Sequence, residues 1–234
     1  MKQIKTIAIK EYKDYFISPI AYIVISLFLI VTGWFFFSTF FIFGRADLRD
    51  FFSLLPITFS FFIPAITMRL FSEEKNVGSY ETLLTMPVSF IDIAMGKFLA
   101  ATLFAVSMLI PTLSYPIFIL FLGEIDFGPV AGGYLGAVLL AAAYCSLGLF
   151  ASSLTRNQII GFIIGCGLCF TLTILNKLLF FMPAKIISLI EYIGADSHFS
   201  NISKGIIDSR DIVYFLSVIF ISIFLTCLVM HEKN

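Results

Sequence analysis

The sequence predicts an all-α integral membrane protein with six transmembrane helices. Of its 234 residues, 59% are hydrophobic and 13% are charged, whereas soluble globular domains carry about 25% charged residues. The mean hydropathy is +1.01. Because no soluble fold of this size can bury so much apolar surface, we expect the chain to lie in a lipid bilayer. The net formal charge of zero argues against a nucleic-acid partner.

Six charge-free segments are each long enough to cross the hydrocarbon core, which takes about 20 helical residues. They are 15–44, 51–68, 98–123, 127–155, 157–176 and 212–230. An even number of spans places both termini on the same side. Positive residues favour the cytoplasmic side, and four of them precede the first span: Lys2, Lys5, Lys10 and Lys13. We therefore expect both termini to be cytoplasmic.

Residues 1–15 have the pattern of an amphipathic helix that lies in the membrane interface. Apolar side chains recur at helical spacing, and lysines between them can reach the lipid headgroups. The apolar positions are Ile4, Ile7, Ala8, Tyr12 and Tyr15. Pro19 disfavours helix at Ser18, so the chain is expected to turn into the bilayer there.

A polar segment, 69–92, separates the second and third apolar segments. We expect the second helix to continue through Arg69 to about Lys75. Arg69 and Glu73 are spaced i, i+4 and can form an ion pair, which contributes a few tenths of a kcal/mol. Gly78 is expected to break this helix. The pattern at 89–92, Ser-Phe-Ile-Asp, matches a capping box in front of the third apolar segment.

Between these two points we expect a short helix that lies across the membrane face. Ser79 can cap its beginning, and Glu81 in the first turn suits the helix dipole. It would end before Pro87, with Tyr80, Leu83, Leu84 and Met86 as its apolar surface. Two interpretations are open: an ordinary ordered loop, or a docking element for a cytoplasmic partner.

The segment 182–211 is too interrupted to span the bilayer. We expect a re-entrant or interfacial helix on the outer side, followed by a short loop or helix. Asp211 would lie near the start of the last helix and suit its dipole. His198 is interpreted as an isolated surface histidine.

Prolines and glycines within the spans have structural and functional interpretations. Pro56, Pro64, Pro111 and Pro116 are candidate helix bends, which are either static kinks or points of flexing during transport. The small-xxx-small patterns at 132–136 and 161–165 favour close helix packing within the chain over a dimer contact.

The sequence lacks the motifs of several chemistries. Its one Gly-Lys pair, at 96–97, is not part of a phosphate loop, and two histidines cannot build a histidine-rich metal site. Almost no ionisable residue appears at mid-depth in the six segments, which counts against a proton- or sodium-driven carrier. We therefore expect no enzymatic activity, cofactor or metal on this chain, and an energy source on a partner.

The stretch IPAITMRLFSEEKNVGSYETLLTMPVS resembles the signature of type-2 ABC transporter permeases. In that signature a proline-containing helix is followed by T-M-R, a Glu-Glu-basic run, G-[ST]-x-E-x-L-L and P-[VI]-S. The N-terminal IAIKEYKDYFISPIAYI is similar to the connecting helix of the family. HFSNISKGIIDSRDIVYFLS is similar to the outer segment and sixth helix of its gliding-motility and nitrous-oxide-reductase-maturation branch. Ser79 stands where threonine is commoner.

The resemblance implies one permease domain over 1–234, with 1–15 as connecting helix, 69–92 as coupling region and 182–211 as outer re-entrant helices and loop. Glu73, Glu74 and 78–84 would form a coupling helix that docks on a separate ATP-binding subunit, which would carry ATP and magnesium. A second permease chain, identical or related, is required. A candidate accessory protein on the outer side and the lipid bilayer complete the implied partners.

The implied function is the transmembrane subunit of an ATP-driven exporter in the cytoplasmic (inner) membrane of a bacterium. The alternative is a membrane scaffold that anchors a multi-protein envelope complex and has no substrate pathway of its own. An intramembrane enzyme is disfavoured, because buried catalytic carboxylates and histidines are missing.

Overall fold

The computed structural model describes residues 2–43, 47–80, 88–121, 126–178, 192–206 and 208–232. Within these ranges the chain forms helices and turns, with no strand. Six helical segments there are long and apolar enough to cross a membrane. The predicted all-α class with six spans is therefore confirmed.

The spans follow each other along the chain with short connections. The first is α2 (Pro19–Phe43), and the second is α3 (Arg49–Thr67) with its continuation α4 (Arg69–Val77). The third is α6 (Phe90–Leu109), continued by the 3₁₀ turn η1 (Ile110–Leu113) and by α7 (Ser114–Leu120). The last three are α8 (Phe127–Leu154), α9 (Gln158–Leu178) and α12 (Ser209–Glu232). Two further helices, α1 (Lys2–Ile17) and α11 (Ala195–Ser203), are not spans.

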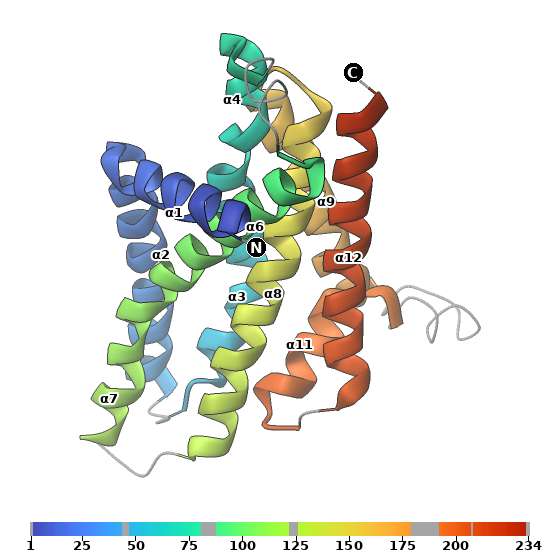
Figure 1. Cartoon of the computed structure of the whole chain (residues 1–234). Helices are drawn as coiled ribbons and strands as arrows, with labels where there is room; N and C mark the ends of the chain where they lie inside the picture. The colour runs from blue at the N-terminus through green and yellow to red at the C-terminus, as the bar shows by residue number, and fades with distance from the viewer. Residues whose placement is uncertain are drawn as a thin grey trace.

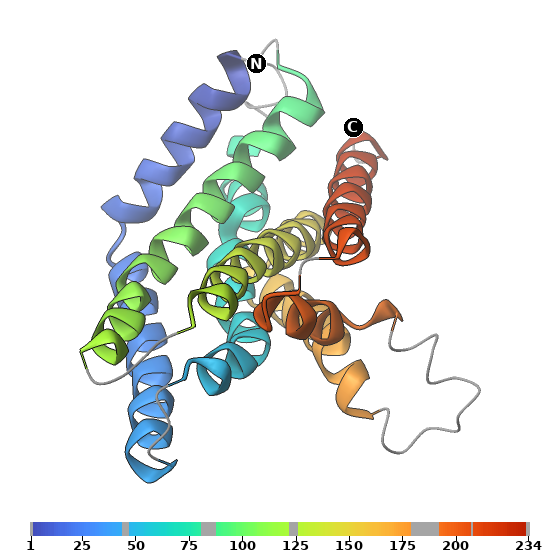
Figure 2. The same ribbon diagram turned by 90° about the horizontal axis from the view of Figure 1, so that it is seen from below.

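Helix α8 is the centre of the bundle. It packs against α3, α6, α9, α11 and α12, which lie around it in the view from below (Figure 2). Small residues make this close packing possible: a Cβ at Gly136 would press on the Phe199 and Ile202 side chains of α11, and one at Gly148 would overlap Thr67 of α3. The small-residue pattern at 132–136 thus serves packing within the chain, as expected.

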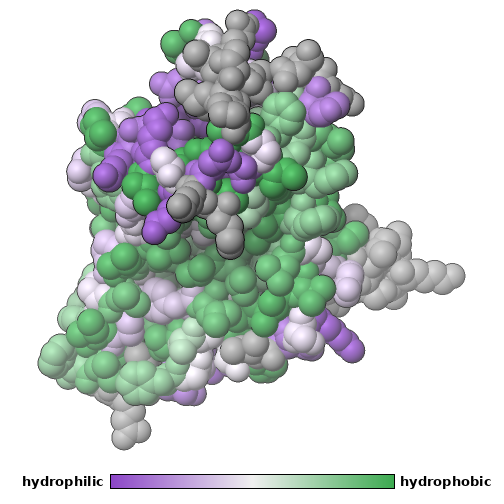
Figure 3. All heavy atoms as spheres, in the orientation of Figure 1, coloured by the Kyte–Doolittle hydropathy of each residue, from purple (hydrophilic) through white to green (hydrophobic). Residues whose placement is uncertain are grey.

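The outer helices present apolar side chains to their surroundings. Large exposed residues on α2, α9 and α12 include Trp34, Phe41, Ile163 and Phe220. Figure 3 shows hydrophobic residues over the middle of the molecule and hydrophilic ones gathered near α1 and α4 at one end. This distribution is that of a multi-pass membrane protein, because lipid-facing side chains need no polar partner.

Helix α1 is amphipathic, as predicted, and lies across the bundle at the α4 end (Figure 1). It packs mainly on α6, with Ala8 and Tyr15 buried and the lysines Lys5, Lys10 and Lys13 exposed. The chain bends at Ser18 before α2 begins at Pro19, which confirms the predicted turn.

The prolines differ in what they do to their helices. Helix α3 runs without interruption through Pro56 and Pro64, and the chain departs from helix at Met68. Pro111 lies in η1, where the helical span changes to a 3₁₀ turn, and Pro116 lies in the first turn of α7. Of the four candidate bends, Pro111 therefore coincides with a change of helix type.

Two expectations need correction. The third charge-free segment begins at residue 98, but its helix begins at Phe90, directly after the predicted cap at Ser89, so Lys97 lies inside the helix, about 10 Å along the axis from its start. It is an ionisable residue within a span, where almost none was expected. His198, interpreted as an isolated surface residue, is only 6% exposed and has specific partners. Of the predicted outer segment 182–211, residues 182–191 and 207 lie outside the described residues.

Candidate functional site at the α1, α4 and α6 junction

The junction between α3 and α4 is held by a serine from another helix. The Ser152 hydroxyl on α8 accepts hydrogen bonds from the backbone N–H groups of Phe71 (2.9 Å) and Ser72 (3.1 Å). The same hydroxyl donates to the carbonyl oxygen of Met68 at 2.8 Å. The first N–H groups of a helix lack partners within that helix, and Ser152 supplies an acceptor as an N-cap residue would. Helix α4 thus begins at a position fixed by α8.

The far end of α4 is fixed by its cap and by α8. Gly78 ends the helix with φ of 82°, a left-handed conformation that glycine adopts without strain. The ammonium group of Lys75 donates to the carbonyl of Ser153 on α8. The predicted break at Gly78 is therefore confirmed.

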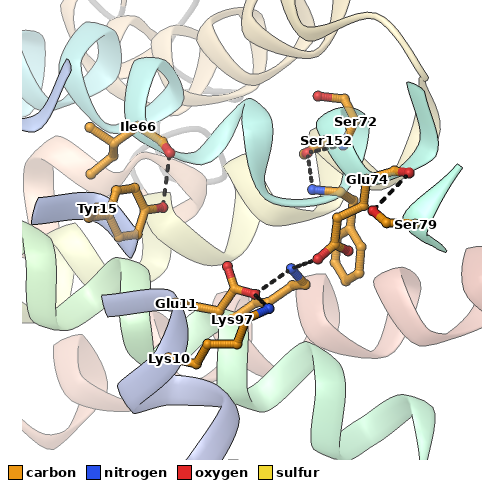
Figure 4. A network of polar contacts seen from close by, with 10 residues as sticks. Lys10, Glu11, Tyr15, Ile66, Ser72, Glu74, Ser79, Lys97 and Ser152 are labelled. Atoms are coloured by element: carbon orange, nitrogen blue, oxygen red, sulfur yellow. Dashed lines mark hydrogen bonds and ion pairs between the residues drawn. The ribbon is translucent and has the colours of Figure 1, made fainter. Parts of the chain in front are cut away.

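Lys97 on α6 is a buried cation that joins three helices (Figure 4). Its Nζ lies 2.6 Å from Glu74 Oε1 on α4 and 3.1 Å from Glu11 Oε1 on α1. The Lys97 side chain is 1% exposed, and the Glu11 and Glu74 side chains are 13% and 18% exposed. A buried charge is tolerated only when it is paired, so Lys97 requires both α1 and α4 in their present positions.

A second connection runs from α1 to the α3–α4 junction. The Tyr15 hydroxyl donates to the carbonyl oxygen of Ile66 at 2.9 Å, and the Arg69 guanidinium lies 4.9 Å from the Tyr15 ring centre. Burial raises the pKa of Tyr15 far above its ordinary value, and the nearby Arg69 opposes this only in part. The phenol therefore stays neutral and remains a hydrogen-bond donor.

One face of α4 is open. A cleft of about 390 Å³ separates α1 from α4, with Lys10, Asp14, Arg69 and Glu73 among its lining residues. On the α4 side of this cleft and next to it, Glu73, Asn76, Val77, Gly78 and Ser79 are exposed, and Val77 has 74% of its surface free. The arrangement is a short helix with a fixed inner face and a free outer face. Mechanically, it can receive a partner and pass a displacement to α1, α6 and α8.

The predicted site residues divide between these two faces. Glu73 and Ser79 are exposed, whereas Glu74 points inward to Lys97. Tyr80 is 7% exposed, its ring lies 6.4 Å from that of Phe71, and burial raises its pKa. Glu81, Leu83 and Leu84 lie outside the described residues.

One local expectation differs from the structure. Arg69 and Glu73, which both lie in the described part, form no ion pair, because Arg69 is directed over Tyr15 and donates to Ser18 Oγ at 3.4 Å. A second feature is at Ser79, whose hydroxyl donates back to the carbonyl of Glu74 at 3.5 Å; the N–H groups that Ser79 was expected to cap belong to residues outside the described part of the chain, so that cap stays a prediction. Of the predicted box at 89–92 the N-cap half is confirmed, since the Ser89 hydroxyl accepts from the Asp92 N–H at 3.1 Å; the Asp92 carboxylate accepts from the Ser89 hydroxyl at 2.8 Å.

Sequence reasoning missed Glu11, Lys97 and Ser152. A signal for the first two was present: each is a single charge on an otherwise apolar helical face, between Ile7 and Tyr15 in one case and between Ala94 and Ala101 in the other. A charge in such a position needs an opposite charge nearby. Ser152 had no such signal, because it bonds backbone groups that are left free where the helix is interrupted at Met68.

Within the described ranges, no group of three or more His, Cys, Asp or Glu side chains is placed to hold a metal ion. Comparison of the chain with models of protein families gives no match, and comparison with curated proteins gives none either. The functional assignment therefore depends on the sequence motif and on the geometry of this junction.

Proposed function

We propose that this chain is the transmembrane permease subunit of an ATP-driven exporter, moved by a separate ATP-binding subunit at the α4 end. The observation that carries the proposal is α4 itself. Its outer face, around Glu73 and Val77, is exposed, and its inner face is fixed to α1, α6 and α8. A helix that is exposed on one face and bonded on the other to three further helices is suited to transmit force.

The proposed transmission follows the contacts. When nucleotide binding moves the partner, α4 is displaced, and the pairing of Glu74 with Lys97 and Glu11 obliges α6 and α1 to follow. Helix α1 leads into α2 through the bend at Ser18, so the movement reaches the first span. A partner that binds one of two conformations more tightly shifts the population toward it. The transport unit has two such permease chains, in a bacterial inner membrane with both termini cytoplasmic.

The test is co-purification from the native host. The tagged chain is expected to retain a nucleotide-binding protein in mild detergent, and Glu73→Arg or Val77→Asp should release it, because both residues lie on the free face of α4. Lys204→Glu is the matched control, an exposed charge reversal near α11. Glu74→Arg is not a docking test, because Glu74 pairs internally.

Gel filtration and circular dichroism should show that each variant keeps the fold. Unchanged co-purification in both α4 variants would contradict the proposal. Co-purification together with an ATP turnover that no cargo alters in vesicles would favour the scaffold alternative.

A further inference from the structure

A buried histidine–aspartate pair joins α11 to α12 at the end of the bundle opposite α4 (Figure 1). His198 Nδ1 lies 2.6 Å from Asp211 Oδ1, with the two side chains 8% and 4% exposed. His198 Nε2 lies 3.0 Å from the carbonyl oxygen of Tyr192. The imidazole also stacks on the Tyr214 ring, with the centres 4.1 Å apart and the planes at 19°.

The partners of His198 fix how many protons the pair holds. A backbone carbonyl oxygen can only accept a hydrogen bond, so Nε2 must carry a proton. The short contact between Nδ1 and the carboxylate requires a second proton between these atoms, bound to one or the other. A neutral imidazole beside an ionised carboxylate holds one proton, so this geometry holds one more.

We infer that the His198–Asp211 pair is a proton-binding site, and that its second proton locks α11 and the 192–193 segment against α12. If that proton leaves, a lone pair on one ring nitrogen faces either the Asp211 carboxylate or the Tyr192 carbonyl. Two acceptors then oppose each other, and one of the two contacts must open.

His198 is the side-chain partner of Asp211 in the described part of the chain. The second oxygen of Asp211, Oδ2, is buried and has no hydrogen-bond partner in the described part of the chain. The carboxylate therefore depends on His198 for its stabilisation. Next to it, the Tyr214 hydroxyl donates to the carbonyl of Ile193 at 2.5 Å, so two neighbouring carbonyls are held by the stacked His198 and Tyr214.

The site can exchange protons with the solution. A cleft of about 290 Å³ reaches the pair and is lined by Tyr192, Ser197, His198, Asn201, Asp208, Arg210 and Asp211. Its position at the opposite end from α4 means that, if α4 is cytoplasmic, the proton comes from the outer compartment. The site therefore senses the pH of the side on which α11 lies.

Other charged groups lie on the elements packed around α11. They are Asp208 and Arg210 at the start of α12, Asp196 and Lys204 at the two ends of α11, Lys177 on α9, Asp126 before α8, and Arg49 and Asp50 at the start of α3. Asp208 and Arg210 line the same cleft with opposite charges. Burial raises the pKa of Asp196, and the positive charge of Lys177 opposes this in part. Asp126 caps α8 through the Gly128 N–H at 3.1 Å.

The test combines two measurements on the full chain in nanodiscs over a range of pH. Nitrogen-15 NMR of labelled histidine counts the protons on His198, and the other histidine of the chain, His231 at the far end of α12, is the internal reference. Amide hydrogen exchange, corrected for its intrinsic pH dependence, reports the protection of α11. We expect exchange in α11 to become about tenfold faster or more, as for one lost charge-assisted hydrogen bond, at the pH at which the pair loses its second proton.

Asp211→Asn is the matched variant, because asparagine keeps the shape and needs no second proton. Its α11 should lack the pH-dependent step, while the exchange of α8 stays unchanged as the control for the global fold. The inference is overturned if wild-type α11 stays protected after the second proton has left, or if His198 and Asp211 hold a single proton while α11 is protected. A step that persists in Asp211→Asn would also overturn it.

Discussion

Replacing Lys97 by methionine should destabilise the protein more than any exposed charge change at the same end. Methionine keeps most of the volume but removes the one cation between Glu11 and Glu74. Their side chains are only 13% and 18% exposed. Removing one partner of a buried ion pair costs about 3–5 kcal/mol, because the remaining charge stays buried. The remaining solvent contact of both carboxylates places the expected loss at the lower end of that range.

The assay is equilibrium unfolding of the purified chain in mild detergent. Two matched variants make it specific. Lys10→Met removes a lysine that is 66% exposed and 3.9 Å from Glu11, and it should change the unfolding free energy by less than about 1 kcal/mol. Lys97→Met combined with Glu11→Gln and Glu74→Gln leaves no charge among these three side chains and should recover most of the loss. The reasoning is refuted if Lys97→Met and Lys10→Met are equally stable, or if the triple variant is no more stable than Lys97→Met.

Three further outcomes are expected in the same unfolding assay. Ser152→Ala should cost about 1–3 kcal/mol, because it leaves buried backbone groups at the start of α4 without partners. Ser153→Ala removes a hydroxyl that is bonded within α8 and should cost less. Equal losses in the two variants would contradict this role of Ser152. Gly148→Ala should cost about 1–3 kcal/mol, because the new methyl group overlaps with α3. Gly167→Ala is the control: nothing lies within 4 Å of its new methyl group, so it should be neutral or stabilising by up to about 1 kcal/mol. A larger loss for Gly167→Ala than for Gly148→Ala would contradict the packing. Above pH 10, the Tyr15 phenol ionises in the unfolded chain but stays neutral in the fold, because burial raises its pKa. Its contribution to the free energy of unfolding therefore falls by about 1.4 kcal/mol per pH unit. Tyr15→Phe should remove this part of the pH dependence, and an unchanged pH dependence would show that the phenol is not buried.

Composition and periodicity were sufficient for the fold class and for most of the spans, because a bilayer constrains sequence strongly: a helix that crosses it must be apolar over about 20 residues. The amphipathic N-terminal helix followed from the same periodicity. The cap at Ser89 located the start of the third helix, but the charge-free segment was counted only from residue 98, so Lys97 was left out of the span. Lys97 is tolerated inside because two carboxylates from other helices reach it, which a reading along one segment does not reveal.

The candidate site was located by its polar residues but not understood in detail. The sequence predicted that Glu73, Glu74 and Gly78 lie at the C-terminal end of the second span, where the structure has them. It did not separate the two glutamates, although Glu73 is exposed and Glu74 is paired with Lys97. That distinction depends on Lys97 of α6 and Glu11 of α1, which lie beside Glu74 in the fold. His198 was missed for a similar reason, because its partner Asp211 comes from the next helix.

The most direct test of the account is photo-crosslinking from Val77 in living cells. A crosslinking amino acid at this position, on the free face of α4, is expected to capture a nucleotide-binding protein. The same amino acid at Tyr192, which is 66% exposed near α11, is expected not to capture it. The account is contradicted if the Val77 position captures no nucleotide-binding protein while the chain is folded in the membrane, or if that protein is captured from Tyr192 instead.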